Sequence, residues 1–72
     1  MQKQIKMIQA LADAEIASAE KLKKMATEAV TENDRERLYI EACENLSSAA
    51  KLREHVLNLI QIQHTIEEQQ NG

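Results

Sequence analysis

The sequence predicts an all-α protein, and more closely an antiparallel two-helix hairpin of the coiled-coil type. The chain of 72 residues has no proline, and its one glycine, Gly72, is the last residue. The rest is rich in Ala, Leu, Glu, Gln, Lys and Met, which favour helices. Apolar residues recur every three or four positions over two long stretches, separated by the polar segment 31–37. We expect one domain, completed to a four-helix bundle by dimerisation or by docking on a helical partner.

The first helix is predicted over residues 2–31. Its apolar residues fall on one broad stripe at helical spacing, flanked by Leu11, Ile16, Met25 and Val30. The members of this stripe are Ile5, Ile8, Ala12, Ala19, Leu22, Ala26 and Ala29. A helix of this length spans roughly 45 Å at 1.5 Å per residue. It presents one apolar side to a partner helix.

A turn is predicted at residues 32–34. Asn33 and Asp34 are poor residues for a helix interior, and Asn33 followed by Glu36 has the spacing of a capping box. A single continuous helix is the alternative, since no proline or glycine forbids it. If the apolar spacing of the first helix continued through a single long helix, however, Asn33, Glu36 and Ser47 would fall on the apolar stripe. Coiled coils do not absorb a shift of this size between the two apolar patterns. We therefore predict a second helix over residues 35–69 and a frayed tail over 70–72.

The second helix carries two neighbouring stripes, about 100° apart around the helix axis. The first consists of Leu38, Ala42, Asn45, Ala49, Leu52, Val56, Leu59, Gln63 and Ile66. The second consists of Tyr39, Cys43, Leu46, Ala50, Arg53, Leu57, Ile60 and His64. One helix cannot cover both stripes, and near Val56 to Ile66 the apolar residues occupy more than half of the circumference. We expect this part to be enclosed by several helices.

The uncovered stripe of the second helix is the predicted partner-binding surface, because exposed apolar stripes of this extent mark interaction sites. Its predicted binding residues are Tyr39, Cys43, Leu46, Ala50, Leu57 and Ile60. A second set on the first helix consists of Met7, Ala10, Ala14 and Ala17. Small side chains there either support the helix on a solvent face or let another helix approach closely. Both readings of this set stay open.

Two charged residues interrupt apolar stripes. In a hairpin, residues whose numbers sum to about 65 lie side by side, so Glu15 falls opposite Ala50 and less than a turn from Arg53. Both can simply extend their charged ends into water at the edge of a bundle. Our hypothesis is that Glu15 and Arg53 pair across the hairpin or across an oligomer interface and fix its register.

The sequence contains no pattern typical of catalysis, cofactor binding or metal binding. A di-metal site in a helical bundle requires carboxylates three residues before the histidines, and His55 and His64 have Leu52 and Gln61 there. No glycine-rich phosphate loop is present. The lone Cys43 lies on an apolar stripe, where cysteine behaves as a small hydrophobic residue. We expect no enzyme activity, no cofactor and no metal.

The composition indicates a cytoplasmic protein. A single cysteine cannot form an internal disulfide, which favours a reducing compartment. The apolar run after the first lysines is cut by Asp13 and Glu15 before a signal-peptide core is complete. No uncharged stretch approaches the roughly 18 residues of a membrane span; the longest, residues 55–66, is about 12 residues long.

The charge balance argues against nucleic acid as the main partner. The chain has 9 basic and 12 acidic residues, a net charge of −3, and its one aromatic residue is Tyr39. Binding to phosphates depends on positive charge, and base stacking depends on aromatic rings. An alternative is a Rop-like dimeric hairpin that binds RNA through Lys21, Lys23, Lys24, Arg35 and Arg37. A purely structural homodimeric bundle is a third possibility.

Residues 20–64 resemble the small E-component co-chaperones of type III secretion needle proteins. The resemblance rests on a polar turn, on Tyr39 just inside the second helix after Asn-Asp-Arg-Glu-Arg-Leu, and on the apolar pattern that follows. That pattern consists of Leu46, Ala49, Ala50, Val56, Leu57, Leu59 and Ile60. The resemblance implies a cytoplasmic protein that binds a helical-repeat chaperone and keeps a needle subunit from polymerising early. It makes Tyr39, Leu46, Leu57 and Ile60 the docking stripe.

Overall fold

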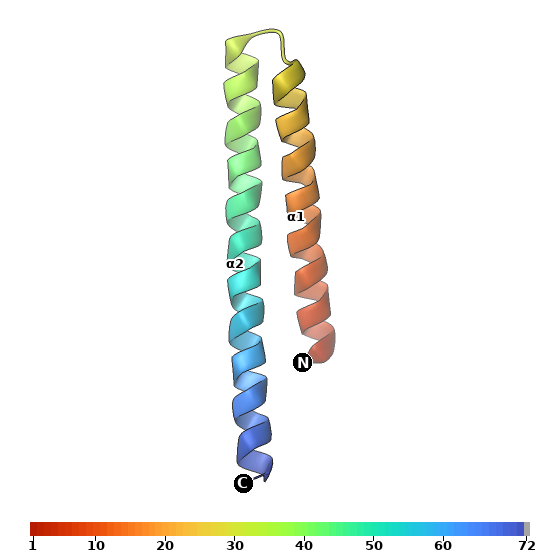
Figure 1. Ribbon diagram of the computed structural model, residues 1–72, viewed down its shortest axis with the longest axis vertical. Coiled ribbons are helices and arrows are strands. Elements are labelled where there is room, and N and C mark those ends of the chain that lie inside the picture. The colour runs from red at the N-terminus through yellow and green to blue at the C-terminus, as the bar shows by residue number, and fades with distance from the viewer. Residues whose placement is uncertain (72) are drawn as a thin grey trace.

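The protein is an antiparallel helical hairpin, as predicted. The computed structural model describes residues 1–71. Helix α1 spans Gln2–Glu28 and helix α2 spans Glu32–Asn71, and the two lie side by side in opposite directions (Figure 1). The Cα trace extends over 62 × 15 × 11 Å. Because α1 has 27 residues and α2 has 40, the C-terminal end of α2 projects beyond the start of α1 (Figure 1).

The turn has the predicted length of three residues but lies earlier in the chain, at residues 29–31 in place of 32–34. Helix α1 ends at Glu28, because Ala29 adopts an extended conformation with φ −67° and ψ 138°. The Arg35 side chain donates a hydrogen bond of 3.4 Å to the Ala29 carbonyl, which places a cation beside the end of α1 where the helix dipole favours it. No residue in the described chain has a positive φ, so this turn does not require glycine.

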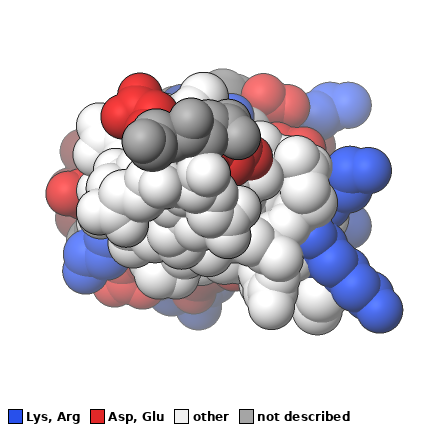
Figure 2. All heavy atoms as spheres, turned by 90° about the horizontal axis from the view of Figure 1, so that it is seen from below, with Lys and Arg blue, Asp and Glu red and all other residues white. Residues whose placement is uncertain are grey.

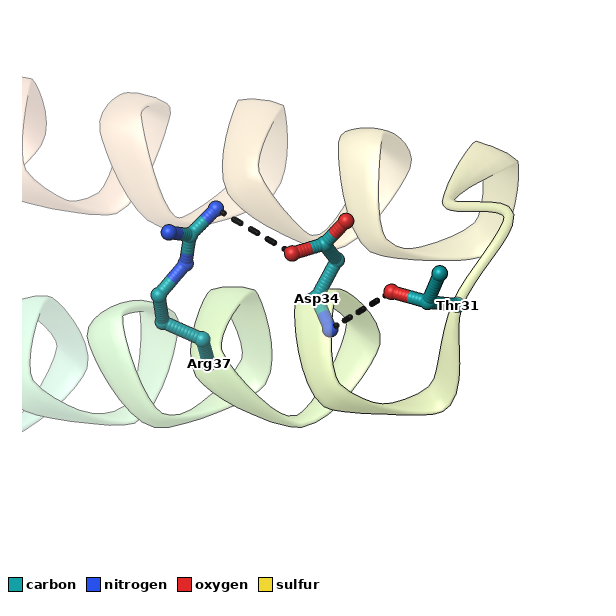
Figure 3. Close-up of polar contacts among 3 residues, drawn as sticks. All are labelled: Thr31, Asp34 and Arg37. Atoms are coloured by element: carbon teal, nitrogen blue, oxygen red, sulfur yellow. Dashed lines mark hydrogen bonds and ion pairs between the residues drawn. The ribbon is translucent and has the colours of Figure 1, made fainter.

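The N-cap of α2 is Thr31, whereas the sequence indicates Asn33. The Asp34 backbone N–H donates to Thr31 Oγ1 at 3.2 Å, the bond that a capping threonine makes to the third helical residue (Figure 3). Asp34 also lies 3.6 Å from the Arg37 guanidinium. Carboxylates of Glu32 and Asp34 in the first turn complement the positive end of the helix dipole. Helix α2 therefore begins at residue 32 and not at 35.

The C-terminal end of α2 also differs from the prediction. The helix continues through Asn71, so residues 70 and 71 belong to it, and the rest of the expected frayed tail lies outside the described residues. Ile62 and Ile66 remain exposed, with exposed fractions of 50% and 43%. Within one chain, α1 is the only other helix of the described residues, so the enclosure by several helices that we expect here needs a further chain.

The seam between the helices is narrow and built largely of alanine. The buried residues are Ile5, Ala12, Ala19, Ala26, Leu38, Ala42, Ala49 and Val56. These belong to the stripe of the first helix and to the first stripe of the second, so the seam is confirmed, except that Ile66 at the end of the second helix's stripe is exposed. Seven-residue spacing recurs along each helix, as in coiled coils. Alanine buries little area, so this seam stabilises the hairpin less than a core of larger side chains.

The hairpin exposes a large surface for its mass. Its solvent-accessible surface is 5681 Å², whereas a compact monomer of 8.2 kDa exposes about 4,500 Å². The difference is roughly 1,100 Å². This excess reflects the two-helix architecture, in which each helix is covered on one side only.

Candidate protein-binding groove

A continuous groove runs along one face of the hairpin, between α1 and α2. Three hollows of about 370, 450 and 350 Å³ follow one another there. The first and second share Gln9 and Ile60, and the second and third share Arg53 and Leu57. Along α2 the groove extends from Leu46 to Glu67, about 30 Å at 1.5 Å per residue. We call this side of the molecule the groove face.

The two walls of the groove differ in chemistry. Helix α2 contributes most of the apolar side chains, which are Leu46, Ala50, Leu57 and Ile60, and also the polar residues Arg53, Glu54, Gln63, His64 and Glu67. Helix α1 contributes a mainly polar wall, which consists of Gln2, Lys6, Gln9 and Asp13, with Ile16 as its apolar member. The seam residues Ile5, Ala12, Ala49 and Val56 form the floor. The apolar side chains of the groove thus come mainly from α2, whereas the hollow at its Glu67 end is mostly polar on both helices.

The groove brings together four of the six partner-binding residues predicted on the second helix. These are Leu46, Ala50, Leu57 and Ile60. Tyr39 and Cys43 continue the same stripe toward the turn, both exposed, but they do not line the three hollows. Leu57 has an exposed fraction of 61% although it lies in the middle of the groove. The second stripe of the second helix is therefore accessible to a partner.

The second predicted set lies elsewhere. Met7, Ala10, Ala14 and Ala17 are all exposed, and none of them lines the groove. Whether another helix covers them stays a prediction. Lys6, Gln9 and Asp13 were not predicted as binding residues, although Gln2, Gln9 and Ile16 recur at seven-residue spacing beside the seam. This seven-residue spacing is the sequence pattern from which the polar wall could have been predicted.

Glu15 and Arg53 do not pair within the hairpin. The one ion pair of the described residues is Arg37 with Asp34. Glu15 is half-buried on the seam side of α1, whereas Arg53 is exposed and lines the groove. The two charges thus belong to different surfaces of the molecule, which corrects the intrachain form of the predicted register pair. A pairing between two chains stays a prediction.

Charged side chains lie around the rim of the hairpin. Viewed from the end that carries the termini, uncharged groups occupy the middle and charged groups lie at the periphery (Figure 2). Of the predicted RNA contacts, Lys21, Lys23 and Lys24 are exposed. Arg35 donates to the turn and Arg37 faces Asp34. Two of the five cations therefore make local contacts at the turn.

Two further observations concern the described part of the chain. Residues 1–71 contain no group of three or more His, Cys, Asp or Glu side chains placed to hold a metal ion. In the same range, neither helix has a stretch that is both long and apolar enough to cross a membrane.

Comparison with known proteins gives no relative on which an assignment could rest. No family model, no curated protein and no solved structure matches this chain.

Proposed function

We propose that this chain is a non-enzymatic protein–protein interaction module that binds an amphipathic helix in its groove. The observation that carries the proposal is the continuous groove into which α2 presents Leu46, Ala50, Leu57 and Ile60. None of these four is among the buried residues of α2, which are Leu38, Ala42, Ala49 and Val56.

The dimensions of the groove suit a helix. The groove runs about 30 Å along α2, which is the length of roughly 20 residues of a partner helix. An apolar centre with a polar rim is the usual anatomy of such interfaces. An amphipathic helix can place its apolar residues on the α2 wall and its polar residues on Lys6, Gln9 and Asp13.

The test is the double variant Leu57→Asp/Ile60→Asp. We expect it to keep its helical circular dichroism spectrum, because neither side chain is buried in the seam, and to lose partners captured from the source cell. The matched control is Leu11→Asp/Met25→Asp, which changes two exposed apolar residues outside the groove. If the groove variant captures the same proteins as the unmodified chain, the proposed binding face is wrong.

A narrower form of the proposal follows from the resemblance of residues 20–64. In this form the chain is a co-chaperone of a type III secretion needle subunit, and the groove takes a helix of a helical-repeat chaperone. The test is co-expression with the needle subunit and the helical-repeat chaperone of one secretion system. A stable ternary complex that is lost with Leu57→Asp/Ile60→Asp supports this form, and separate elution of the chain contradicts it.

A further inference from the structure

We infer that Glu15 and Asn45 form a polar layer in the seam that fixes the register of α1 against α2. The two side chains are half-buried, one on each helix, and face each other across the hairpin. Together they hold the chain in the register whose turn lies at residues 29–31 and disfavour a second register, in which α2 slides by seven residues. The inference concerns the fold and does not depend on the proposed function.

The observed register follows from the residues that meet between the helices. On the groove face Ile16 and Leu46 line one hollow, and Met1 and Leu59 line another hollow that shares no residue with the groove. The numbers of these facing residues sum to 62 and to 60, as expected for a turn centred on residue 30. In this register Glu15 faces Asn45.

The polar layer interrupts a row of the seam that is otherwise apolar. The row consists of the positions at seven-residue spacing from Glu15 on α1 and from Asn45 on α2. Its facing pairs are Met1 with Leu59, Ile8 with Leu52, Glu15 with Asn45 and Leu22 with Leu38. Three pairs are apolar on both helices and one is polar on both. No polar side chain of this row therefore faces an apolar one.

The buried alanines of the seam do not distinguish the two registers. They recur every seven residues, as Ala12, Ala19 and Ala26 on α1 and as Ala42 and Ala49 on α2. If α2 slides by seven residues, Ala19 faces Ala49 and Ala26 faces Ala42, so alanine still packs against alanine. The close approach of the two helices is thus compatible with both registers.

The turn is also compatible with the second register. A slide of seven residues moves the centre of the turn by half that number, from residue 30 to between residues 33 and 34. Asn33 is a capping residue type near that point, and Asn33 followed by Glu36 has the spacing of a capping box. The segment contains no glycine or proline that would tie the turn to the Thr31 cap.

Only the polar layer makes the second register unfavourable. After the slide Glu15 faces Leu52 and Asn45 faces Leu22, so two half-buried polar groups lie against leucines. A polar group buried against apolar side chains without a partner costs free energy, and polar residues in the seam of a coiled coil specify its register in this way. In the observed register neither residue has a buried polar atom without a hydrogen-bond partner.

The register also determines which residues of the two helices meet in the groove. In the observed register Ile16 lies beside Leu46, Ala49 and Ala50. After a slide of seven residues Ile16 would be level with Arg53. The polar layer therefore maintains the present lining of the groove.

Cross-linking within one chain measures which register is populated. Gln4 and His55 line the same hollow in the observed register, and a slide of seven residues, about 10 Å, brings Ile62 to the place of His55. The first reporter is Gln4→Cys/His55→Cys and the second is Gln4→Cys/Ile62→Cys, both in a chain that carries Cys43→Ala. Each is treated with a short bis-maleimide at low protein concentration. The ratio of the first to the second one-chain cross-linking rate reports the register.

Removal of the polar layer should lower this ratio. In the unmodified seam we expect the first reporter to react faster. Glu15→Leu/Asn45→Leu should lower the ratio at least about tenfold, because both registers then place leucine against leucine. Asn45→Leu alone should lower it equally, since Glu15 then faces a leucine in either register. The control Ser18→Leu/Ser48→Leu, which adds two leucines at exposed positions, should leave the ratio unchanged.

The test does not depend on a single variant. Glu15→Leu, Asn45→Leu and the double variant predict the same fall in the ratio, and each should keep its helical circular dichroism spectrum because the seam gains apolar area. An unchanged ratio in these variants overturns the inference. A control that lowers the ratio as much as they do overturns it as well.

The two caps should shift the ratio in opposite directions once the polar layer is removed. In Glu15→Leu/Asn45→Leu, the further change Thr31→Ala should lower the ratio about fivefold, because it removes the cap of the observed register. Asn33→Ala should raise the ratio, because it removes the cap of the second register. Equal ratios for the two cap variants overturn the inference.

Discussion

The two helices of this hairpin differ in the number of apolar stripes they carry. This difference indicates which residues hold the hairpin together and which are free to bind a partner. Helix α1 has one buried stripe and a mainly polar side toward the groove, whereas α2 has a buried stripe and a second apolar stripe beside it. The adjacent residues Ala49 and Ala50 show the contrast: Ala49 has an exposed fraction of 2% and Ala50 is exposed. The first stripe of α2 is sufficient to pack α1. The second is available for a partner.

Truncation of one leucine in each stripe of α2 should give the largest difference in the free energy of unfolding between the two stripes. Leu38→Ala in the seam should lower the free energy of unfolding by about 2–3 kcal/mol, because Leu38 is buried and its removal leaves a cavity. Leu57→Ala should change it by less than about 0.5 kcal/mol at concentrations where the chain is monomeric, since Leu57 is exposed. Urea unfolding at fixed protein concentration measures both. Equal losses would show that the groove belongs to the folding core.

Replacement of the adjacent Ala49 and Ala50 by larger residues tests the same difference between the buried and the exposed stripe. Ala49→Leu should destabilise the hairpin by about 1–3 kcal/mol, because the seam has no room for three further carbon atoms. Ala50→Leu should leave the melting temperature of the monomer nearly unchanged. A tolerated Ala49→Leu would contradict the close packing of the seam.

Removal of the helix cap in the turn should lower the stability of the hairpin by a smaller amount, which does not depend on either stripe of α2. Thr31→Ala should cost about 1 kcal/mol, because the Asp34 N–H loses its cap. Thr27→Ala is the control, since the Thr27 hydroxyl donates to the Lys24 carbonyl at 2.7 Å within α1 and is exposed. Thermal unfolding followed by circular dichroism measures the two. A larger loss for Thr27→Ala would indicate that Thr31 is not the effective cap.

The smallest effect is expected for the coupling of Glu15 and Arg53. Because Glu15 lies half-buried on the seam side of α1 and Arg53 lies in the groove, their alanine variants should add within about 0.5 kcal/mol in the monomer. A double-mutant cycle measures this coupling. A coupling free energy above about 1 kcal/mol would show that the two charges interact within the chain.

The sequence was sufficient to predict the hairpin, the seam and the uncovered stripe of the second helix. These follow from spacing alone, because residues three and four apart share a helix face. The bounds of the turn were less accurate: Thr31 and Asn33 are both capping residue types, and only the extended backbone at Ala29 decides between them. The polar wall was missed because Lys6, Gln9 and Asp13 are indistinguishable from solvent-facing residues until the position of α2 is known.

The second stripe of α2 is proposed to be an association surface that is separate from the folding core. The decisive measurement compares the proteins captured by the unmodified chain, by Leu57→Asp/Ile60→Asp and by the control Leu11→Asp/Met25→Asp. We expect the groove variant to lose the partner and the control to keep it. Capture of the same proteins by all three chains would show that this stripe is not the association surface.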